Sequence, residues 1–303
     1  MSSPAKAAQK GPAMSDHLED KHFAAIAALV ERDAGIKLPQ TKRTMVEGRL
    51  RKRVRATGLA DLADYGRLLF ERGGLEKEYV HLIDCVSTNK TDFFREPSHF
   101  EFLAQRAVPA LRKLQGGRQT KLKIWSAACS IGAEAYTIAM VLQDLASNTR
   151  DGGSLSFSIL GTDISTQVLA TARAAIYPAS FIEPVPAAMQ QRYVMRARSA
   201  SQETVRIVPE LRRKTAFEHL NLMDARYPFD RDVDVIFCRN VLIYFDRPTQ
   251  AAVLSRLTSH LRPGGYLLLG HSESMAGAGV PGLRSVAPTI YQADPVGLRR
   301  NAA

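Results

Sequence analysis

The chain has 303 residues, of which 45% are hydrophobic, and a formal net charge of +11 from 41 basic and 30 acidic residues. This length suffices for two domains and a sizeable core, but no apolar run reaches the roughly 20 residues of a membrane span, and residues 1–14 lack the apolar centre of a secretory signal. The basic balance predicts attraction to a polyanion, either a nucleic acid or an acidic protein surface.

The first third of the chain is predicted to be helical. Apolar residues recur at helical spacing over residues 22–32, 41–55, 62–70 and 75–86, and a further helix is expected over 100–114. The domain boundaries that this pattern suggests are a disordered tail at 1–15, a helical domain at 16–95, a linker helix at 96–118 and an α/β domain at 119–303.

The second predicted helix is strongly basic. Residues 41–55 read TKRTMVEGRLRKRVR, and the apolar side chains at helical spacing leave the cations on the outer face. The candidates for docking an acidic partner are Arg49, Arg51, Arg53 and Arg55. A merely solvated face is the alternative, and nucleic acid is disfavoured because the stretch has no aromatic side chains for base stacking.

From residue 119 the chain alternates strand and helix, which is typical of a parallel sheet. The string IWSAACSIGAEAY (124–136) predicts a strand, a turn of small residues and a helix start, where a ligand can approach the backbone and the positive end of the helix. The next strand, 157–163, ends in Asp163. An acid at this place accepts hydrogen bonds from ribose hydroxyls, or else Asp163 caps the helix that begins near Ser165.

Polar residues follow two later strands as well. Strand 233–238 is followed by Arg239 and Asn240, and strand 266–270 by residues 271–274, at the sheet edge where open α/β folds bind ligands. His271, Ser272 and Glu273 look like a catalytic triad, but adjacent residues do not converge on one point, so we expect a strand-end network.

A break in the alternation and the chain's last segment complete the pattern. Prolines and two short strand-like runs interrupt residues 177–214, which predicts a small β insertion near 190–214. Residues 283–293 are expected to form a hairpin-like strand pair.

These strings together resemble the CheR-type chemotaxis methyltransferases, which transfer a methyl group from S-adenosylmethionine to receptor glutamates and release S-adenosylhomocysteine. The resemblance runs in order from about Asp16 to Gln292 and rests on STNKTDFFREPSHF (87–100), IWSAACSIGAEAY, GTDIS, FCRNVLIYFD and RPGGYLLLGHSES. It implies a Rossmann-like class I methyltransferase domain, a small all-helical N-terminal domain and a short β insertion. The family usually has two consecutive acids after the loop glycine, whereas this chain has Ala133 and Glu134, so only the second can be carried over.

The resemblance also assigns residues to the cofactor. It places Asn89, Thr91 and Arg95 at the methionine end, Glu134 at the amino acid or ribose, Asp163 at the ribose, Asn221 and Leu222 beside the adenine, and Arg239 and Asn240 among the further contacts. Arg95 suits bidentate pairing with a carboxylate and, with Tyr244 in the methyl-transfer channel, is a candidate catalytic residue. Alternatively, Asn89 and Thr91 cap the next helix, and Arg239 pairs with a nearby acid such as Asp234.

The implied partners are the Glu-rich cytoplasmic methylation helices of chemoreceptors at the basic helix and, in some members, a receptor C-terminal tether peptide at the β insertion. A glutamate has an ordinary pKa of about 4.3 and is already anionic at pH 7, so positioning, rather than a general base, should drive the reaction. Cys85, Cys129 and Cys238 lack metal-ligand spacing. We therefore expect reduced thiols in a cytoplasmic enzyme, without a metal, a nucleic-acid partner or membrane insertion.

Three other functions compete with this interpretation. A nicotinamide dehydrogenase would normally show G-x-G-x-x-G, which residues 126–132 do not. A nucleic-acid methyltransferase suits the charge, but the amino-directed DNA enzymes usually carry Asn/Asp-Pro-Pro-aromatic where this chain has residues 239–242. A regulator that binds S-adenosylmethionine without catalysis is the third, and Ala133 favours it slightly.

Overall fold

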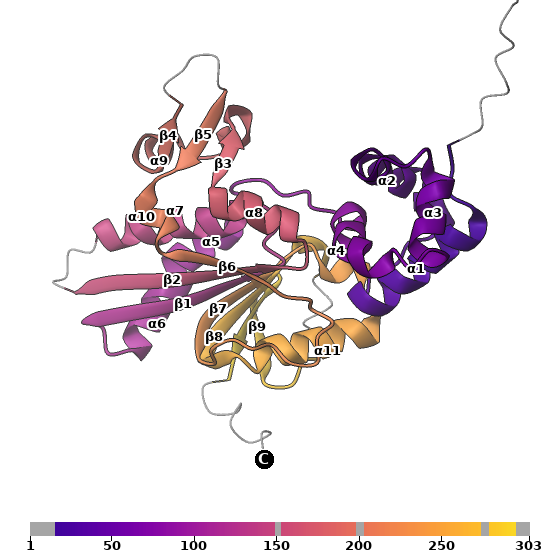
Figure 1. Cartoon of the computed structure of the whole chain (residues 1–303). Coiled ribbons are helices and arrows are strands. Elements are labelled where there is room, and N and C mark those ends of the chain that lie inside the picture. Colours follow the sequence, from indigo (N-terminus) through magenta and orange to yellow (C-terminus); the bar gives the residue numbers. More distant parts are fainter. Residues whose placement is uncertain (1–15, 149–152, 198–202, 274–278, 295–303) are drawn as a thin grey trace, which may run out of the picture. The chain divides into compact units, whose positions relative to one another are not determined.

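The computed structural model describes residues 16–148, 153–197, 203–273 and 279–294 (Figure 1). These residues form two compact units. The first contains the chain up to Val30 together with Leu38–Val86, and the second contains Glu31–Lys37 and the chain from Ser87 onward. The predicted disordered tail lies outside the described residues.

The first unit is all-helical, as predicted. It contains most of α1 (Asp20–Ala34), α2 (Arg43–Thr57), α3 (Leu62–Phe70) and α4 (Leu75–Val86). The apolar stripes of these helices are buried against one another: Phe23, Ile26, Val46, Leu50, Leu62, Tyr65 and Leu82 are at most 1% exposed. Gly58 ends α2 with a φ of +69°, and the Asp61 side chain caps α3 by accepting a hydrogen bond from the Asp64 N–H.

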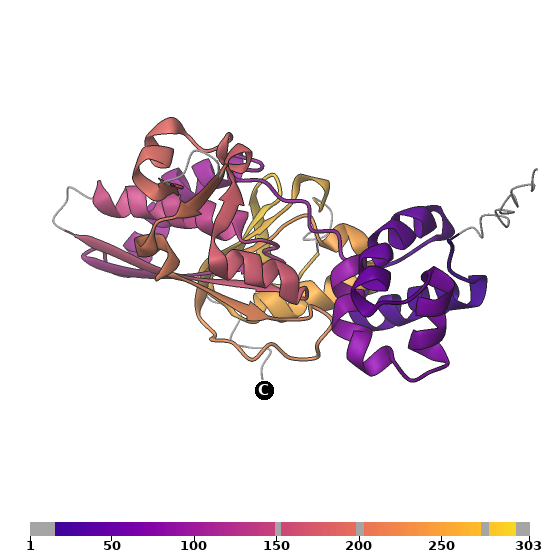
Figure 2. The ribbon, with the colours of Figure 1, turned by 45° about the horizontal axis from the view of Figure 1, so that its top comes forward.

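The second unit is built on a seven-stranded sheet of order β6-β2-β1-β7-β8-β10-β9 (Figures 1 and 2). Its parallel strands are β6 (Thr215–His219), β2 (Ser154–Asp163), β1 (Gln119–Ala127), β7 (Val233–Cys238) and β8 (Leu261–Leu269), and the antiparallel hairpin is β9 (Leu283–Ala287) with β10 (Ile290–Ala293). In β1, Ala127 pairs with both Thr162 and Cys238. The three central strands therefore end side by side, which brings the residues after them together.

Helices cover both faces of this sheet. Along β1, Leu122 and Ile124 join one hydrophobic cluster, and Trp125 and Ala127 join another, as the alternation of a strand requires. The first cluster includes α7 (Ala133–Ser147) and the helical run of α5 (Ser98–Phe102), the π-helical turn Leu103–Ala107 and α6 (Val108–Leu114); the second includes α11 (Arg247–Thr258). The predicted helix over 100–114 is confirmed.

The β insertion forms a separate three-stranded sheet of order β3-β5-β4. Its strands are β3 (Ile176–Pro178), β5 (Thr204–Ile207) and β4 (Val194–Arg196), flanked by α9 (Ala187–Tyr193) and α10 (Pro209–Arg212). The prediction placed it too late, because β3 follows α8 (Thr166–Ala174) after a single left-handed residue, Ala175. A three-residue strand ending in proline carries no alternation signal.

Strand β8 also begins earlier than predicted, at Leu261 rather than at residue 266. Its start is irregular, since the register with β7 shifts between Val233 and Val235 and Gly264 has a φ of +79°. The Pro-Gly-Gly string at 263–265 therefore lies in the bulged beginning of the strand.

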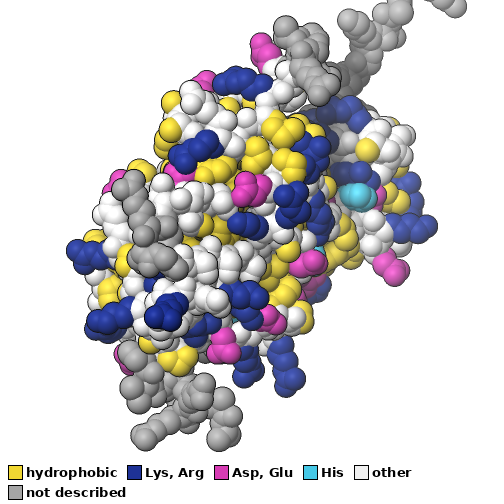
Figure 3. Space-filling view, turned by 90° about the vertical axis from the view of Figure 1, so that its left-hand side faces the viewer, with side chains coloured by type: hydrophobic (Ala, Val, Ile, Leu, Met, Phe, Trp, Pro, Cys, Tyr) yellow, Lys and Arg dark blue, Asp and Glu magenta, His cyan; other side chains and the backbone are white. Residues whose placement is uncertain are grey.

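The surface mixes charge types. On the face shown in Figure 3, lysine and arginine side chains are interspersed with acidic and hydrophobic ones. Within the described ranges, no helix is both long and apolar enough to cross a membrane.

Candidate functional site

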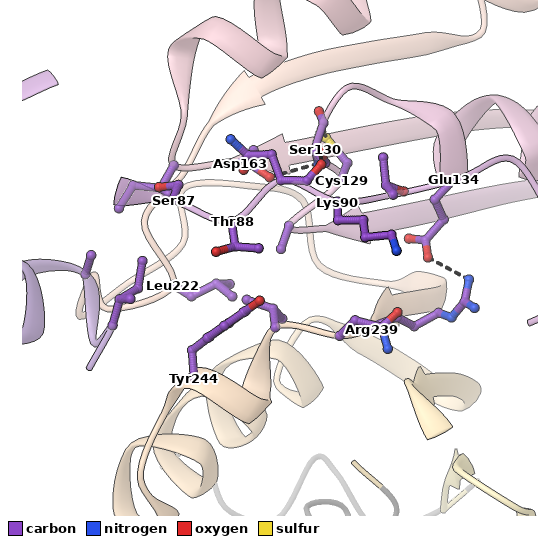
Figure 4. A pocket seen from close by; sticks show the side chains of 18 of the residues that line it. Ser87, Thr88, Lys90, Cys129, Ser130, Glu134, Asp163, Leu222, Arg239 and Tyr244 are labelled. Atoms are coloured by element: carbon purple, nitrogen blue, oxygen red, sulfur yellow. Dashed lines mark hydrogen bonds and ion pairs between the residues drawn. The ribbon is translucent and has the colours of Figure 1, made fainter. Parts of the chain in front are cut away.

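A pocket opens in the second unit, beyond the carboxyl ends of β1, β2, β6 and β7 (Figure 4). Its empty volume, part of its mouth included, is about 950 Å³. The ten residues that the sequence assigned to the cofactor and to catalysis all lie on its walls: Asn89, Thr91, Arg95, Glu134, Asp163, Asn221, Leu222, Arg239, Asn240 and Tyr244. Five separate segments of the chain supply them, which is how open α/β sheets build a ligand site.

Asp163 is the fixed anion of this pocket. Its carboxylate is 7% exposed and accepts hydrogen bonds from the Ser130 N–H at 2.8 Å and the Ser165 N–H at 2.9 Å. The cap of α8 is the Ser165 hydroxyl, which accepts from the Val168 N–H, so the alternative that Asp163 is the helix cap is wrong. A carboxylate can accept about four hydrogen bonds, and an acid at the end of this strand fits a pair of ribose hydroxyls.

The loop after β1 is a tight turn with unusual backbone conformations. Ala128, Ser130 and Gly132 all have positive φ values, of 57°, 51° and 84°. At Gly132, a Cβ atom would lie 2.9 Å from the Ala172 side chain, so a larger residue does not fit. The small residues seen in the sequence are thus required by the turn itself. Sequence reasoning did not single out Ser130, whose N–H orients Asp163.

Arg239 is buried between two carboxylates. Its side chain is 2% exposed, and its guanidinium pairs with Glu134 at 2.9 Å and with Glu96 at 3.0 Å. It also donates to the Arg95 carbonyl and lies over the Phe100 ring. Burial acts to raise the pKa of Glu96, but the Arg239 charge together with hydrogen bonds from Arg239 and Asn240 leaves that pKa below its ordinary value. Arg239 therefore ties residues 95–96 to α7.

The alternative partner of Arg239 is wrong. Asp234 lies near the other end of β7 and pairs with Arg262 at 2.9 Å. Burial raises the pKa of Asp234.

Residues 87–96 cross the pocket as an irregular segment. The Asn89 carbonyl accepts a hydrogen bond from the Ser130 hydroxyl at 2.9 Å, and the Arg95 guanidinium donates to the Lys90 carbonyl at 3.1 Å. Pro97 occupies the cap position of α5 without a side-chain hydrogen bond, so the alternative that Asn89 or Thr91 caps that helix is wrong.

Asn221 has both ends of its amide engaged. Its nitrogen donates to the Asp33 carbonyl at 2.5 Å, and its oxygen accepts from the Met223 N–H at 2.9 Å. It thereby holds the end of α1, where Ala34 and, just beyond the helix, Ile36 also line the pocket and were missed from sequence. The sequence feature that could have indicated this close approach is Gly35. Its φ is +69°, and a Cβ there would lie 2.6 Å from the Phe245 ring.

Tyr244 ends a short 3₁₀ turn, Leu242–Tyr244. Figure 4 shows its ring reaching from this turn into the cavity, on the opposite side from Ser130 and Asp163. The turn follows β7 directly, so the position of the Tyr244 hydroxyl depends on how the loop at 239–241 is held.

Three side chains beside Arg239 could hold a metal by distance alone. Glu96, His99 and His271 offer atoms within 4.8 Å of one another. Burial and then the Arg239 charge lower the pKa of His99 to about 4, and the guanidinium lies 3.0 Å from the Glu96 carboxylate. A metal ion would compete with that buried cation, so we assign no metal here.

The basic helix of the first unit is less free than predicted. Arg53 binds both oxygens of Glu78, at 2.9 and 2.8 Å, and Tyr65 donates to the same carboxylate. Arg51 pairs with Asp16 at 2.8 Å, and Arg49 donates to the Val86 carbonyl. The expectation that all these cations face outward is wrong for Arg53, because Glu78 is buried and needs a counter-charge. Lys52 and Arg55 are exposed.

Comparison with known proteins agrees with this architecture. Residues 21–87 match the all-alpha domain of CheR methyltransferases, and residues 89–286 match their S-adenosylmethionine-binding domain.

Curated relatives match over most of their length. The chemotaxis protein methyltransferase of Klebsiella aerogenes is 40% identical over 259 residues, which cover 86% of this chain and 85% of that protein. The Escherichia coli enzyme of the same name is 39% identical over 86% of both chains. A probable chemotaxis protein methyltransferase of Rhizobium etli is 38% identical over 90% of this chain and all of its own length. The chain belongs to the CheR family of S-adenosylmethionine-dependent chemotaxis methyltransferases.

Proposed function

We propose that this protein methylates glutamate side chains on the cytoplasmic helices of chemoreceptors and thereby forms glutamate methyl esters. The observation that carries the proposal is the make-up of the pocket. It combines a ribose-type acid, Asp163, with a tyrosine at the opposite wall, and none of the described residues that line it is a histidine. Burial raises the pKa of its cysteine, Cys129, far above the ordinary value, so that thiol is no nucleophile at neutral pH.

S-adenosylmethionine supplies a methyl group bonded to a positively charged sulfur. A substrate carboxylate oxygen forms the new bond to the methyl carbon while the carbon–sulfur bond breaks and its electron pair stays on sulfur. No proton moves, because the substrate glutamate is already ionised at pH 7. The pocket therefore has to position two groups and exclude water between them.

The proposed roles follow from the positions of the side chains on the pocket walls. Asp163 accepts from the ribose hydroxyls, and Leu222 packs beside the adenine. Arg95 pairs with the methionine carboxylate, with Asn89 and Thr91 beside it. Arg239 acts by holding Glu134 and residues 95–96 in place rather than by direct contact. Tyr244 orients the substrate carboxylate against the methyl group.

The acidic receptor helix is proposed to dock on α2, through Arg55 and Lys52 together with Arg49 and Arg51. Replacing Lys52 and Arg55 by Glu should slow the methylation of a receptor fragment severalfold and leave S-adenosylhomocysteine affinity unchanged. Raising the salt concentration should weaken the wild-type interaction, because exposed charges are screened over about 8–10 Å. A tether peptide bound at the β insertion and a cytoplasmic location belong to the same proposal.

The test is transfer of labelled methyl from S-adenosylmethionine to a purified receptor cytoplasmic fragment. Carboxyl methyl esters release methanol in mild base, so the label should become volatile after alkali treatment and should map to glutamates by mass spectrometry. Asp163→Ala serves as the matched variant with weakened cofactor binding. Label in added DNA or RNA would favour a nucleic-acid methyltransferase, and cofactor binding without any transfer would favour a regulator.

A further inference from the structure

Glu273 is a buried carboxylate that no proposed step of the reaction uses. It ends the short 3₁₀ turn His271–Glu273 that follows β8, and it is 4% exposed. No lysine, arginine or histidine is recorded as its salt-bridge partner among the described residues. A buried carboxylate is costly unless its oxygens are hydrogen-bonded, so its partners show what it is for.

Its partners are backbone amides. One carboxylate oxygen accepts from the Asn240 N–H at 2.8 Å and from the Gly270 N–H at 2.7 Å, and the other accepts from the Leu242 N–H at 2.7 Å. Burial raises the pKa of Glu273, and these amide hydrogen bonds act against that rise. Glu273 thus joins the loop after β8 to the loop after β7.

The loop after β7 requires such support. Asn240 has a φ of +59°, a left-handed conformation that is uncommon for a residue with a side chain. Asn240, Val241 and Tyr244 all line the pocket. The two loops lie so close together that no side chain fits at Gly270. A Cβ there would lie 2.6 Å from the side-chain amide nitrogen of Asn240 and 2.8 Å from the Glu273 carboxylate.

We propose that Glu273 is a positioning residue for methyl transfer, which holds the backbone of residues 240–242 so that Asn240 and Tyr244 face the cofactor. The proposal rests on the functions proposed for those two residues, although neither its contacts nor its first test requires the receptor substrate. Glu273 acts through the loop and touches neither the cofactor nor the substrate.

Glu273→Gln tests this with almost no change of shape. An amide nitrogen must then face at least one backbone N–H, so the three-amide contact cannot be kept. The matched control is Asp234→Asn, at the other end of β7. Asp234 is 0% exposed and accepts from the Lys123 N–H at 2.7 Å, but it does not line the pocket.

Both variants should lose thermal stability, but only Glu273→Gln should change function. We expect its S-adenosylhomocysteine affinity, measured by calorimetry, and its single-turnover rate at saturating substrates to fall about tenfold, since misplacement by ~1 Å can cost about 100-fold in rate. Asp234→Asn should stay within about twofold of wild type. A folded Glu273→Gln protein with wild-type affinity and rate would overturn the proposal. If the wild type methylates no receptor fragment, the proposed substrate is wrong, and affinity still tests Glu273.

Hydrogen exchange of the wild-type protein decides the question even if Glu273→Gln fails to fold. The Asn240 and Leu242 amides should exchange as slowly as those of β7, although they lie outside the sheet. Exchange of these amides at the rate of an open loop would contradict the proposed hydrogen bonds to Glu273. Combining Glu273→Gln with Tyr244→Phe adds a further test: their effects on rate should be less than multiplicative, and fully multiplicative effects would show that Glu273 does not act through Tyr244.

Discussion

Helix α2 and the strand-end loops of the second unit both concentrate charged side chains, but they use them differently. In α2, Arg53 is matched to Glu78, and the pair is part of the helix packing. In the loops, Asp163 and Glu273 accept hydrogen bonds from backbone N–H groups. A carboxylate held by amides remains a fixed acceptor that can orient a ligand or a loop. The partners of a charge, rather than the local density of charges, therefore indicate whether it serves folding or function.

Arg239 is the exception among the strand-end residues, and removing it should have the largest effect. Arg239→Met leaves Glu96 and Glu134 without their buried counter-charge, which should cost about 3–5 kcal/mol of unfolding free energy. Urea unfolding of the full chain measures this. Arg192→Met, which removes a partly exposed pair with Asp144, should cost less than about 1 kcal/mol. Equal losses of unfolding free energy in the two variants would show that the buried Arg239 ion pairs stabilise the protein no more than a partly exposed pair does.

Asp163→Ala should chiefly affect binding. The two ribose hydroxyls lose their acceptor in a closed site, which should weaken S-adenosylhomocysteine binding by about 1–3 kcal/mol. Ser165→Ala is the control, because it removes only the cap of α8 and should cost about 1 kcal/mol of folding stability without changing affinity. Calorimetry separates the two outcomes. Unchanged affinity in a folded Asp163→Ala protein would rule out the ribose assignment.

The basic helix should show the opposite behaviour. Arg53→Met leaves the buried Glu78 carboxylate short of two hydrogen bonds and should cost about 1–3 kcal/mol of stability with no change in cofactor affinity. Arg55→Met removes a cation from the exposed face and should change stability by less than about 0.5 kcal/mol. Thermal unfolding compares the two. If Arg55→Met is the more destabilising, the internal role given to Arg53 is wrong.

Much of the fold could be predicted from the sequence, because its helices and strands have strong periodicity. The helices at 62–70 and 75–86 and the buried strand at 233–238 have the predicted bounds. The start of the β insertion could not be predicted, since β3 has only three residues. Local sequence patterns are enough to predict long helices and strands, whereas a short strand such as β3 depends on the strand with which it pairs.

The pocket residues that lie in a sequence motif could be predicted. Those that distant segments of the chain bring to the pocket could not. Asp163 and Asn240 follow buried strands, so their edge of the sheet could be inferred. The end of α1, at Ala34, lies far away in sequence and is held at the pocket by the Asn221 amide. The pairing of Arg53 with Glu78 joins residues 25 apart on different helices, and no periodicity reports such a contact.

Acid should distinguish the two units, with the smallest expected effect. In the first unit, ion pairs outweigh burial and hold the pKa values of Glu47 and Glu78 below their ordinary range. Their stabilisation is present above the unfolded pKa of about 4.3 and is lost as pH falls through the folded values. In the second unit, burial raises the pKa values of Asp234 and Glu273, which opposes the acid sensitivity of Glu96.

The helical unit should therefore lose hydrogen-exchange protection first as the pH falls below about 4.3. Exchange followed by mass spectrometry between pH 3 and 6, corrected for the intrinsic pH dependence, compares the two units in one sample. Earlier loss of protection in β1 and β7 than in α2 and α4 would contradict this ordering.

The central claim is that the pocket positions a pre-ionised carboxylate and needs no base. The most direct measurement is the single-turnover methylation rate of a receptor fragment at saturating cofactor and substrate. We predict a nearly flat rate from about pH 6 to 8, because a glutamate is ionised throughout this range. Tyr244→Phe should lower the rate without changing the profile. A rate that rises tenfold per pH unit in a protein folded at both ends would contradict the claim, and His271 would be the first residue to replace.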